Sequence, residues 1–421
     1  MADTIYALSS GAPPAGIGVI RISGPLAGEA LSRMANGLPP PRSPRLRILR
    51  NGEGAALDQA LVMWFAGPNT ATGEDLAEIH CHGGRAVVAA LLAALSSIDG
   101  LREAEPGEFT RHAFSNGRID LAEAEGLADL LSAETELQRR GALLAAGGDL
   151  SRRIEGWRDR VLGLAASIEA VIDFADEDDV SLPASFSREL DELIGEIRAT
   201  SQRPATERLR DGIRVVLAGP PNAGKSSLFN ALLSDDAAIV TSEAGTTRDV
   251  LERPVSIGGV PFVLVDTAGM RDSGAGAIEE MGIERARKEV ANGHIVLWLG
   301  APDELPVGAI QISAKSDLGA GQSEGLEVSA VTGFGLSELT DTLVEKAREI
   351  LPPVDQIAFN RRQREWAQTA AQSLEAVDTH SDLLIAAENL RAARRALDRL
   401  VGRDSTEEML DALFGRFCIG K

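Results

Sequence analysis

The sequence is poor in cysteine and has no long apolar run. Its two cysteines, Cys81 and Cys418, lie far apart in a chain of 421 residues, so nothing indicates a disulfide framework. We expect both to be free thiols in a reducing compartment. No apolar stretch approaches the roughly 18 residues that a membrane helix needs, and the first residues lack the basic and apolar regions of a signal peptide. These absences predict a cytoplasmic protein that has no association with a membrane.

Positive charge is also scarce. The chain has 42 Lys and Arg residues against 63 Asp and Glu residues, which gives a formal net charge of -21. Contacts to phosphate groups need an excess of Lys and Arg, so this balance argues against a protein that coats nucleic acid without specificity. A local basic site is still compatible with it, and we interpret the acidity mainly as a feature that favours solubility.

The chain is long enough for two or three domains, and the pattern of predicted strands and helices changes along its length. Residues 1–117 mix short β-like runs, such as 18–22 and 61–65, with one helix-like run, 86–95, which indicates a compact α/β domain. Residues 118–210 and 353–421 have long helical periodicity. Residues 211–352 alternate β-like and helical runs, which predicts a mostly parallel doubly wound sheet. The expected fold class is multidomain α/β plus all-α, with a doubly wound α/β domain inserted into a helical domain.

The segment GPPNAGKSS at residues 219–227 fits the P-loop pattern G-x-x-x-x-G-K-S and lies between a β-like run and a helix-like run. In such a loop the glycines turn backbone N–H groups toward phosphates, and the helix N-terminus adds the positive end of a dipole. Lys225 would reach the outer phosphates, and the hydroxyl of Ser226 would bind Mg²⁺. The segment predicts a phosphate site formed by Asn222, Ala223, Gly224, Lys225, Ser226 and Ser227.

A second phosphate-side motif follows a hairpin. The Gly258-Gly259 pair predicts a tight turn with one antiparallel strand, and Asp266 in VDTAG ends the next apolar run. A carboxylate there can hold Mg²⁺ through water, and the amide of Gly269 can sense the γ-phosphate. Thr247 in AGTTRD is a candidate for a second hydroxyl ligand of Mg²⁺. Alone, Asp266 would more often be a solvated strand-end carboxylate, but the motif order favours a nucleotide site that includes Asp266, Thr267, Ala268 and Gly269.

The segments GPPNAGKSS, GTTRD, DTAG, AKSD and VSA are similar in type and order to those of the TrmE-Era-EngA-like class of translational GTPases. The resemblance implies that Asp317 pairs with the N1–H and amino group of guanine, that the stem of Lys315 covers the base, and that Ser329 and Ala330 complete the base site. That class has Asn-Lys-x-Asp in this loop, whereas position 314 here is Ala.

Alanine in place of asparagine at position 314 should have a small energetic cost. Losing the amide removes about one or two hydrogen bonds of roughly 1 kcal/mol each, but the aspartate that separates guanine from adenine is kept. We therefore expect GTP to be preferred over ATP, with an affinity for GTP that the loss of the amide weakens by about tenfold or somewhat more. The alternative is that AKSD is only a polar loop and that the base is read elsewhere.

Further motifs extend the resemblance along essentially the whole chain. TGEDLAEIHCHGG, PGEFTRHAFSNGRIDL, IEEMGIERA and the terminal CIGK after LFGRF resemble the family of tRNA modification GTPases called MnmE or TrmE. The resemblance implies an N-terminal domain (1–117) that binds tetrahydrofolate and dimerises. It also implies a helical domain (118–210 and 353–421) that is split by the GTPase domain (211–352), with a C-terminal tail that returns to the folate site.

The same resemblance implies partners and cofactors. The resemblance implies a homodimer that works with the FAD protein MnmG (GidA) in a heterotetramer. Together they would install an aminomethyl or carboxymethylaminomethyl group at C5 of the wobble uridine of certain tRNAs. The one-carbon unit would come from a 5-formyl or methylene form of tetrahydrofolate, and Mg²⁺ and K⁺ would serve the GTPase domain.

Several residues can be carried over for the folate site. Arg21 in GVIRISG and Glu78 in EIHCHGG match family contacts, and a carboxylate suits the paired N–H donors of a pterin ring. Arg118 in NGRID stands where the family often has lysine, so the charge is kept while the contact geometry can differ. Lys421 would complete the site. Without the family match, these residues would be interpreted as surface cations and a capping carboxylate.

In the GTPase domain, Asn222 matches a residue that binds K⁺ in this family. The loop after it would wrap the same ion, with Thr241, Glu243 and Thr246 as ligands, and a cation there can neutralise developing charge when two such domains meet. Glu279 in IEEMG would orient the attacking water, although alone it would be a solvated helix charge. The expected catalytic set is Glu279, Lys225 and Thr247, and the loop residues expected at the nucleotide are Thr241, Ser242, Glu243, Ala244, Gly245, Thr246 and Thr247.

Three other features can be explained without a functional role. His80, Cys81 and His82 could suggest a metal site, but neighbouring side chains on a strand point to opposite faces. The acidic run 173–179 is expected to be a solvated loop. Cys418 is either a reactive thiol or a small apolar group between Phe417 and Ile419.

Two alternative functions stay open. One is a nucleotide-gated scaffold with little hydrolysis, which Ala314 and the short segment between Leu299 and Ile310 favour. The other is a ribosome-assembly GTPase that shares only the GTPase domain. Folate binding would separate this second alternative from the main hypothesis, because such a GTPase has no use for Arg21, Glu78 and Lys421.

Overall fold

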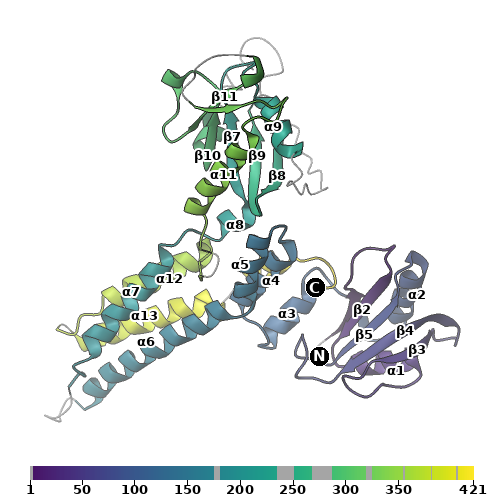
Figure 1. Cartoon of the computed structure of the whole chain (residues 1–421). Helices are drawn as coiled ribbons and strands as arrows, with labels where there is room; N and C mark the ends of the chain where they lie inside the picture. Colours follow the sequence, from purple (N-terminus) through teal and green to yellow (C-terminus); the bar gives the residue numbers. More distant parts are fainter. Residues whose placement is uncertain are drawn as a thin grey trace. The chain divides into compact units, whose positions relative to one another are not determined.

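The chain forms two compact units in the computed structural model (Figure 1). The first unit contains residues 1–128 and 398–421, and the second contains residues 129–397. The structure describes residues 3–174, 181–234, 251–267, 287–318, 325–353, 356–380, 382–403 and 406–421.

The first unit is built on a six-stranded sheet of order β3-β4-β5-β2-β1-β6. All described pairs are antiparallel except β1 with β6. Its elements are β1 (Thr4–Leu8), β2 (Ile17–Ser23), α1 (Ala27–Ala35), β3 (Arg45–Arg50), β4 (Ala56–Phe65), β5 (Leu76–His82), α2 (Arg85–Ser96), β6 (Leu101–Glu103), α3 (Glu108–Ser115) and α14 (Glu407–Phe414), with α4 (Leu121–Ser132) beginning in it.

Alternation along the strands decides which side chains form the core of this sheet. Ile20 and Ile22 of β2 are fully buried and pack with residues of α1 and α2, such as Leu31 and Leu91. Because successive strand side chains point to opposite faces, Arg21 lies on the other face. The sequence-based expectation included α2 but not α1, so the helical content of this domain was underestimated.

The C-terminal residues pack on the N-terminal domain within the first unit. Ile419 forms an antiparallel bridge with Pro106. Gly107 has a φ of 72°, and a Cβ added to it would lie 2.1 Å from the carbonyl oxygen of Phe414. This close approach of the two backbones requires glycine.

The second unit contains helices and a second six-stranded sheet. The helices are α5 (Glu136–Ala146), α6 (Asp149–Asp173), α7 (Phe186–Ser201), α8 (Glu207–Asp211), α9 (Lys225–Ser234), α11 (Leu336–Ile350), α12 (Arg361–Glu375) and α13 (Leu383–Leu400), with short 3-10 turns η2 (Pro302–Glu304) and η3 (Ser316–Leu318). The strands are β7 (Ile213–Ala218), β8 (Leu251–Ile257), β9 (Val260–Asp266), β10 (Ile295–Trp298), β11 (Ile310–Ala314) and β12 (Leu326–Val328).

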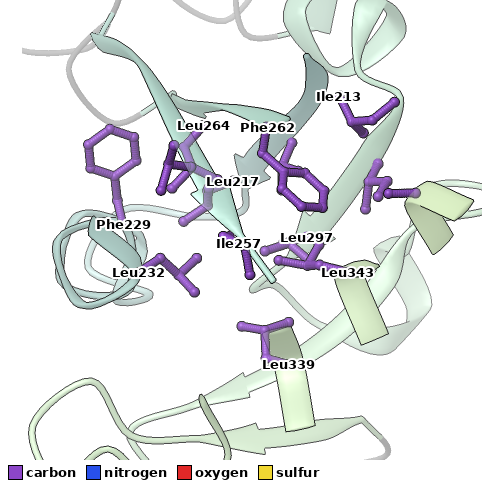
Figure 2. Close-up of a cluster of buried hydrophobic side chains, with 14 of the residues drawn as sticks. Ile213, Leu217, Phe229, Leu232, Ile257, Phe262, Leu264, Leu297, Leu339 and Leu343 are labelled. Carbon is purple, nitrogen blue, oxygen red and sulfur yellow. The ribbon is translucent and has the colours of Figure 1, made fainter. Parts of the chain in front are cut away.

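The second sheet has the order β12-β11-β10-β7-β9-β8 and is parallel except for the β8–β9 hairpin. Gly258 and Gly259 form the turn of that hairpin with φ values of 57° and 78°, as the sequence predicted. Leu232 of α9 and Leu343 of α11 share the core with Leu217 and Phe262 of the sheet (Figure 2). The expected fold class is confirmed.

Candidate functional site

The P-loop joins β7 to α9 at the carboxyl end of the parallel strands. Gly219 has a φ of 142°, and a Cβ added there would lie 3.0 Å from the carbonyl carbon of Leu299. Lys225 is 5% exposed, and its Nζ donates to the carbonyl oxygens of Gly219 at 3.0 Å and Pro220 at 2.8 Å. These bonds hold the ammonium group against its own loop, where phosphate oxygens would bind.

Asp266 and Thr267 lie beside the P-loop because β9 pairs with β7. The register places Leu217 opposite Asp266, and the two site residues are 2% and 4% exposed. The hydroxyl of Thr267 donates to the carbonyl oxygen of Leu217 at 2.8 Å. Ser226 is exposed in the first turn of α9. A hydroxyl and a carboxylate at this edge are hard oxygen donors, which fit Mg²⁺.

The predicted base-reading loop lies against the P-loop. Lys315 follows β11 with a φ of 65°, and its Nζ donates to the carbonyl oxygen of Asn222 at 2.6 Å. Gly224 faces the same loop, since a Cβ added to it would lie 3.4 Å from Cβ of Ala314. The base-reading loop and the P-loop are far apart in the sequence, but the parallel order of β11, β10 and β7 brings them to the same edge of the sheet.

Asp317 is held by a residue from the neighbouring strand end. The hydroxyl of Ser329, a fully buried residue, donates to Oδ1 of Asp317 at 2.7 Å. The backbone N–H of Thr332 donates to the same hydroxyl at 3.2 Å. Ala330 follows Ser329 and is half-buried. The hydroxyl of Ser329 therefore orients the carboxylate of Asp317, while Asp317 itself stays exposed.

The other predicted GTPase residues lie outside the described residues and stay predictions. They are Thr241, Ser242, Glu243, Ala244, Gly245, Thr246, Thr247, Ala268, Gly269 and Glu279.

Two of the predicted folate residues form an ion pair on the sheet of the first unit. Arg21 and Glu78 are directly opposite on β2 and β5, and Nη2 of Arg21 lies 2.9 Å from Oε1 of Glu78. Nε2 of His80 lies 3.4 Å from the other oxygen of Glu78. The guanidinium carbon of Arg21 lies 5.8 Å from the ring centre of Phe109, which provides an aromatic surface for the cation.

Arg118 and Lys421 lie in the same unit. Arg118 is exposed after α3, and its Cγ would lie 3.1 Å from a Cβ added to Gly73. Lys421 is half-buried and its backbone N–H donates to the carbonyl oxygen of Cys418 at 3.2 Å. Cys418 is exposed. The role of each of these residues stays a prediction.

A polar chain next to these residues was missed by sequence reasoning. The hydroxyls of Ser23 and Thr72 share a hydrogen bond of 2.7 Å, and Ser23 also donates to Glu74 at 3.0 Å. Nδ1 of His112 lies 3.0 Å from the same carboxylate oxygen of Glu74. Glu74 and His112 also line a cavity of about 620 Å³. The motifs TGED and FTRHAF contain these residues, but no spacing signal indicated that they meet.

Side chains of the HCHGG segment alternate between the buried and the exposed face of β5. Cys81 is buried, and its Sγ lies 3.3 Å from the carbonyl oxygen of Gly18. Burial raises the pKa of the Cys81 thiol, whereas His82 is exposed and pairs with Asp58. Among the described residues, no group of three or more His, Cys, Asp and Glu side chains is placed to hold a metal.

Comparison with known proteins gives matches along the whole chain. The family described as GTP-binding protein TrmE N-terminus matches residues 4–118, and the family of the MnmE helical domain matches residues 121–418. Proteins described as tRNA modification GTPase MnmE are similar over their full length: that of Erythrobacter litoralis is 57% identical and that of Novosphingobium aromaticivorans 54% identical, each with 100% of both chains covered.

Among solved structures, the G domain of the FeoB iron transporter of T. maritima is 25% identical with a TM-score of 0.25, and covers 32% of this chain and 98% of that chain. At this TM-score the similarity supports no functional comparison. Within the described part of the chain, no helix is both long and apolar enough to cross a membrane.

Proposed function

Because the chain belongs to the MnmE family of tRNA modification GTPases, we propose that it hydrolyses GTP in the course of modifying tRNA in the cytoplasm. The observation that carries the GTPase part is the meeting of two loops at one sheet edge. Lys225 lies in the P-loop, and Asp317 lies in a base-reading loop that Lys315 ties to the P-loop.

Guanine selection rests on Asp317. Its carboxylate can accept from the N1–H and amino group of guanine, a pair of donors that adenine does not present. The Ser329 hydroxyl at 2.7 Å fixes one carboxylate oxygen. A preoriented acceptor loses less conformational entropy on binding, which favours guanine nucleotides although Ala314 lacks an amide.

Metal ions would complete the phosphate site. Ser226 and Asp266 would hold Mg²⁺ with Thr247, and Asn222 would supply an amide oxygen to K⁺ together with Thr241, Glu243 and Thr246. When bound, these cations supply positive charge that stabilises negative charge on the phosphates. Among the chain's own residues, Lys225 binds the outer phosphates and Glu279 would orient the attacking water.

The first unit would supply the one-carbon chemistry. Arg21, Glu78, Arg118 and Lys421 would bind a 5-formyl or methylene tetrahydrofolate, and the ion pair of Arg21 with Glu78 offers both a cation and a carboxylate to such a ligand. With the flavoprotein MnmG and its FAD, the protein would install an aminomethyl or carboxymethylaminomethyl group at C5 of the wobble uridine of certain tRNAs.

A homodimer, within a heterotetramer with MnmG, is the proposed assembly. Exposed apolar side chains on paired strands support a self-association surface in the first unit: Leu46 is 57% exposed, and its cross-strand neighbour Leu61 is 38% exposed. A monomer at micromolar concentration in size-exclusion chromatography would contradict this part.

A nucleotide-gated scaffold is the second candidate, and Ala314 favours it. The test is GTP turnover by the full-length protein at high concentration in K⁺ buffer and in Na⁺ buffer, with Lys225→Ala as the inactive control. We expect turnover that K⁺ stimulates, and no turnover in K⁺ would favour the scaffold. Tetrahydrofolate binding by equilibrium dialysis, weakened in Glu78→Gln, separates the proposal from a ribosome-assembly GTPase.

A further inference from the structure

A polar chain of Ser23, Thr72, Glu74 and His112 joins the sheet of the first unit to α3. Oε2 of Glu74 accepts a hydrogen bond from the hydroxyl of Ser23 at 3.0 Å and lies 3.0 Å from Nδ1 of His112. The single hydroxyl proton of Ser23 is thereby used, so the hydroxyl of Thr72 is the donor in the 2.7 Å bond between Ser23 and Thr72. Ser23 and Thr72 are 0% and 1% exposed, and burial strengthens such bonds. One carboxylate oxygen therefore connects the end of β2 to α3.

The TGED segment (residues 72–75) makes a second connection to the end of α3. Nδ2 of Asn116 donates to the carbonyl oxygen of Thr72 at 2.8 Å. Gly73 has a φ of 81°, and a Cβ added to it would lie 2.7 Å from Cβ of Asn116 and 3.1 Å from Cγ of Arg118. Only glycine allows the backbone to approach those two side chains so closely. The TGED segment therefore lies directly against the stem of Arg118.

The proposed folate residues come from two separate elements. Arg21 and Glu78 lie opposite each other on β2 and β5, whereas Arg118 follows the end of α3. Ser23 is two residues beyond Arg21 on β2, so the polar chain begins on the same face of the sheet as Arg21. One ligand can contact both the sheet and Arg118 only when α3 is held at a fixed place on the sheet. The polar chain and the TGED segment provide that attachment.

We propose that Glu74 is a positioning residue for the folate site. Its carboxylate fixes the TGED segment to β2 and to α3, and the segment holds the stem of Arg118 where a ligand on Arg21 and Glu78 can reach it. The role requires no contact between Glu74 and the ligand. This inference rests on the folate part of the proposed function, and it gives Glu74 an effect on Arg118 but none on Lys421.

The test uses Glu74→Met and Glu74→Gln in the full-length protein. Methionine keeps an unbranched stem but accepts neither hydrogen bond, whereas glutamine keeps one oxygen that can accept from Ser23 and His112. The matched control is Glu29→Met, because Glu29 pairs with Arg33 within α1, on the opposite face of the sheet.

The first readout is the affinity for 5-formyltetrahydrofolate by isothermal titration calorimetry. We expect Glu74→Met to bind it about tenfold more weakly than wild type, the factor for losing one charge-assisted hydrogen bond. Glu74→Gln should lose only about threefold, because it keeps an acceptor, and Glu29→Met should bind as wild type does. The melting temperature of each variant shows that it is folded in the assay, and Glu74→Gln replaces Glu74→Met if the latter is not.

The second readout separates positioning from a general loosening of the domain. Glu74→Met is combined with Arg118→Met and, separately, with Lys421→Met, whose backbone N–H bonds within the C-terminal tail to Cys418. In the Arg118→Met background, Glu74→Met should cost less than about threefold further, because the residue that it positions is already gone. In the Lys421→Met background it should still cost about tenfold, since independent effects add.

The outcomes separate this inference from the function on which it rests. No binding of 5-formyltetrahydrofolate by wild type would overturn the folate part of the proposed function and the inference with it. Binding by wild type that a folded Glu74→Met protein retains in full would overturn the inference alone. An equal loss from Glu74→Met in the wild-type and Arg118→Met backgrounds would also overturn it, because Glu74 would then act without Arg118.

Discussion

Replacing Ala314 with asparagine should strengthen nucleotide binding. Ala314 ends β11 and is half-buried, with its Cβ 3.4 Å from a Cβ added to Gly224. Gly224 has no side chain, so an amide at position 314 has room beside the P-loop backbone. Such an amide can make about one or two neutral hydrogen bonds of roughly 1 kcal/mol each.

The expected size of the effect follows from those bonds. At about 1.4 kcal/mol per factor of ten, Ala314→Asn should tighten GTP and GDP by about tenfold. The ratio of GTP to ATP affinity should not change, because Asp317 and its partner Ser329 are untouched. The assay is competitive titration of a fluorescent guanine nucleotide with GTP, GDP and ATP.

A matched control separates hydrogen bonding from packing. Ala314→Leu has nearly the shape of asparagine without the amide, so it should give no gain in affinity. The reasoning is refuted if Ala314→Asn leaves the affinity for GDP unchanged, or if it changes the ratio of GTP to ATP.

Three further predictions concern other contacts. Ser329→Ala should weaken GDP binding by about five- to tenfold in the same titration, because Asp317 loses its hydrogen-bond partner at 2.7 Å. The exposure of Asp317 to solvent limits the energy of that bond. An unchanged affinity for GDP would show that the hydroxyl of Ser329 does not orient Asp317. Burial alone raises the pKa of Glu108, but hydrogen bonds from Arg102 and from the Glu105 N–H outweigh it and hold the pKa below the usual 4.5. The ionised form of Glu108 therefore adds stability above about pH 4.5, and this stability is lost as the pH falls through the folded-state pKa. The difference in melting temperature between wild type and Glu108→Gln should therefore shrink on acidification. A difference that grew on acidification would contradict this prediction. Gly107→Ala should destabilise the protein by about 2 kcal/mol or more in thermal unfolding, because the added Cβ would lie 2.1 Å from the carbonyl oxygen of Phe414. The control is Gly117→Ala, where φ is 65° and an added Cβ has no atom within 4 Å. This control should cost only about 1 kcal/mol.

Local motifs predicted the GTPase fold well. The P-loop pattern and the Gly258-Gly259 turn are determined by neighbouring residues, so sequence alone placed β7, α9 and the β8–β9 hairpin. Helix α1 was missed because Gly28 weakens its helical pattern. The structure explains that glycine: a Cβ on Gly28 would lie 2.9 Å from the indole of Trp64, so tertiary packing overrides local propensity.

Contacts between distant residues could not be predicted from spacing. The bonds of Lys315 with Asn222 and of Ser329 with Asp317 depend on the order of strands in the sheet, which no single motif contains. The chain from Ser23 through Glu74 to His112 likewise joins three segments that have no common pattern.

The central proposal is that this tRNA modification GTPase acts on the wobble uridine of tRNA through a GTP-dependent reaction. The most direct measurement is mass spectrometry of nucleosides from the tRNA of cells that lack the protein, with complementation by wild type and by Lys225→Ala. We predict that the aminomethyl-type substituent at C5 is lost, is restored by wild type and is not restored by Lys225→Ala. An unchanged level of the C5-modified wobble uridine in the deletion strain would contradict the account.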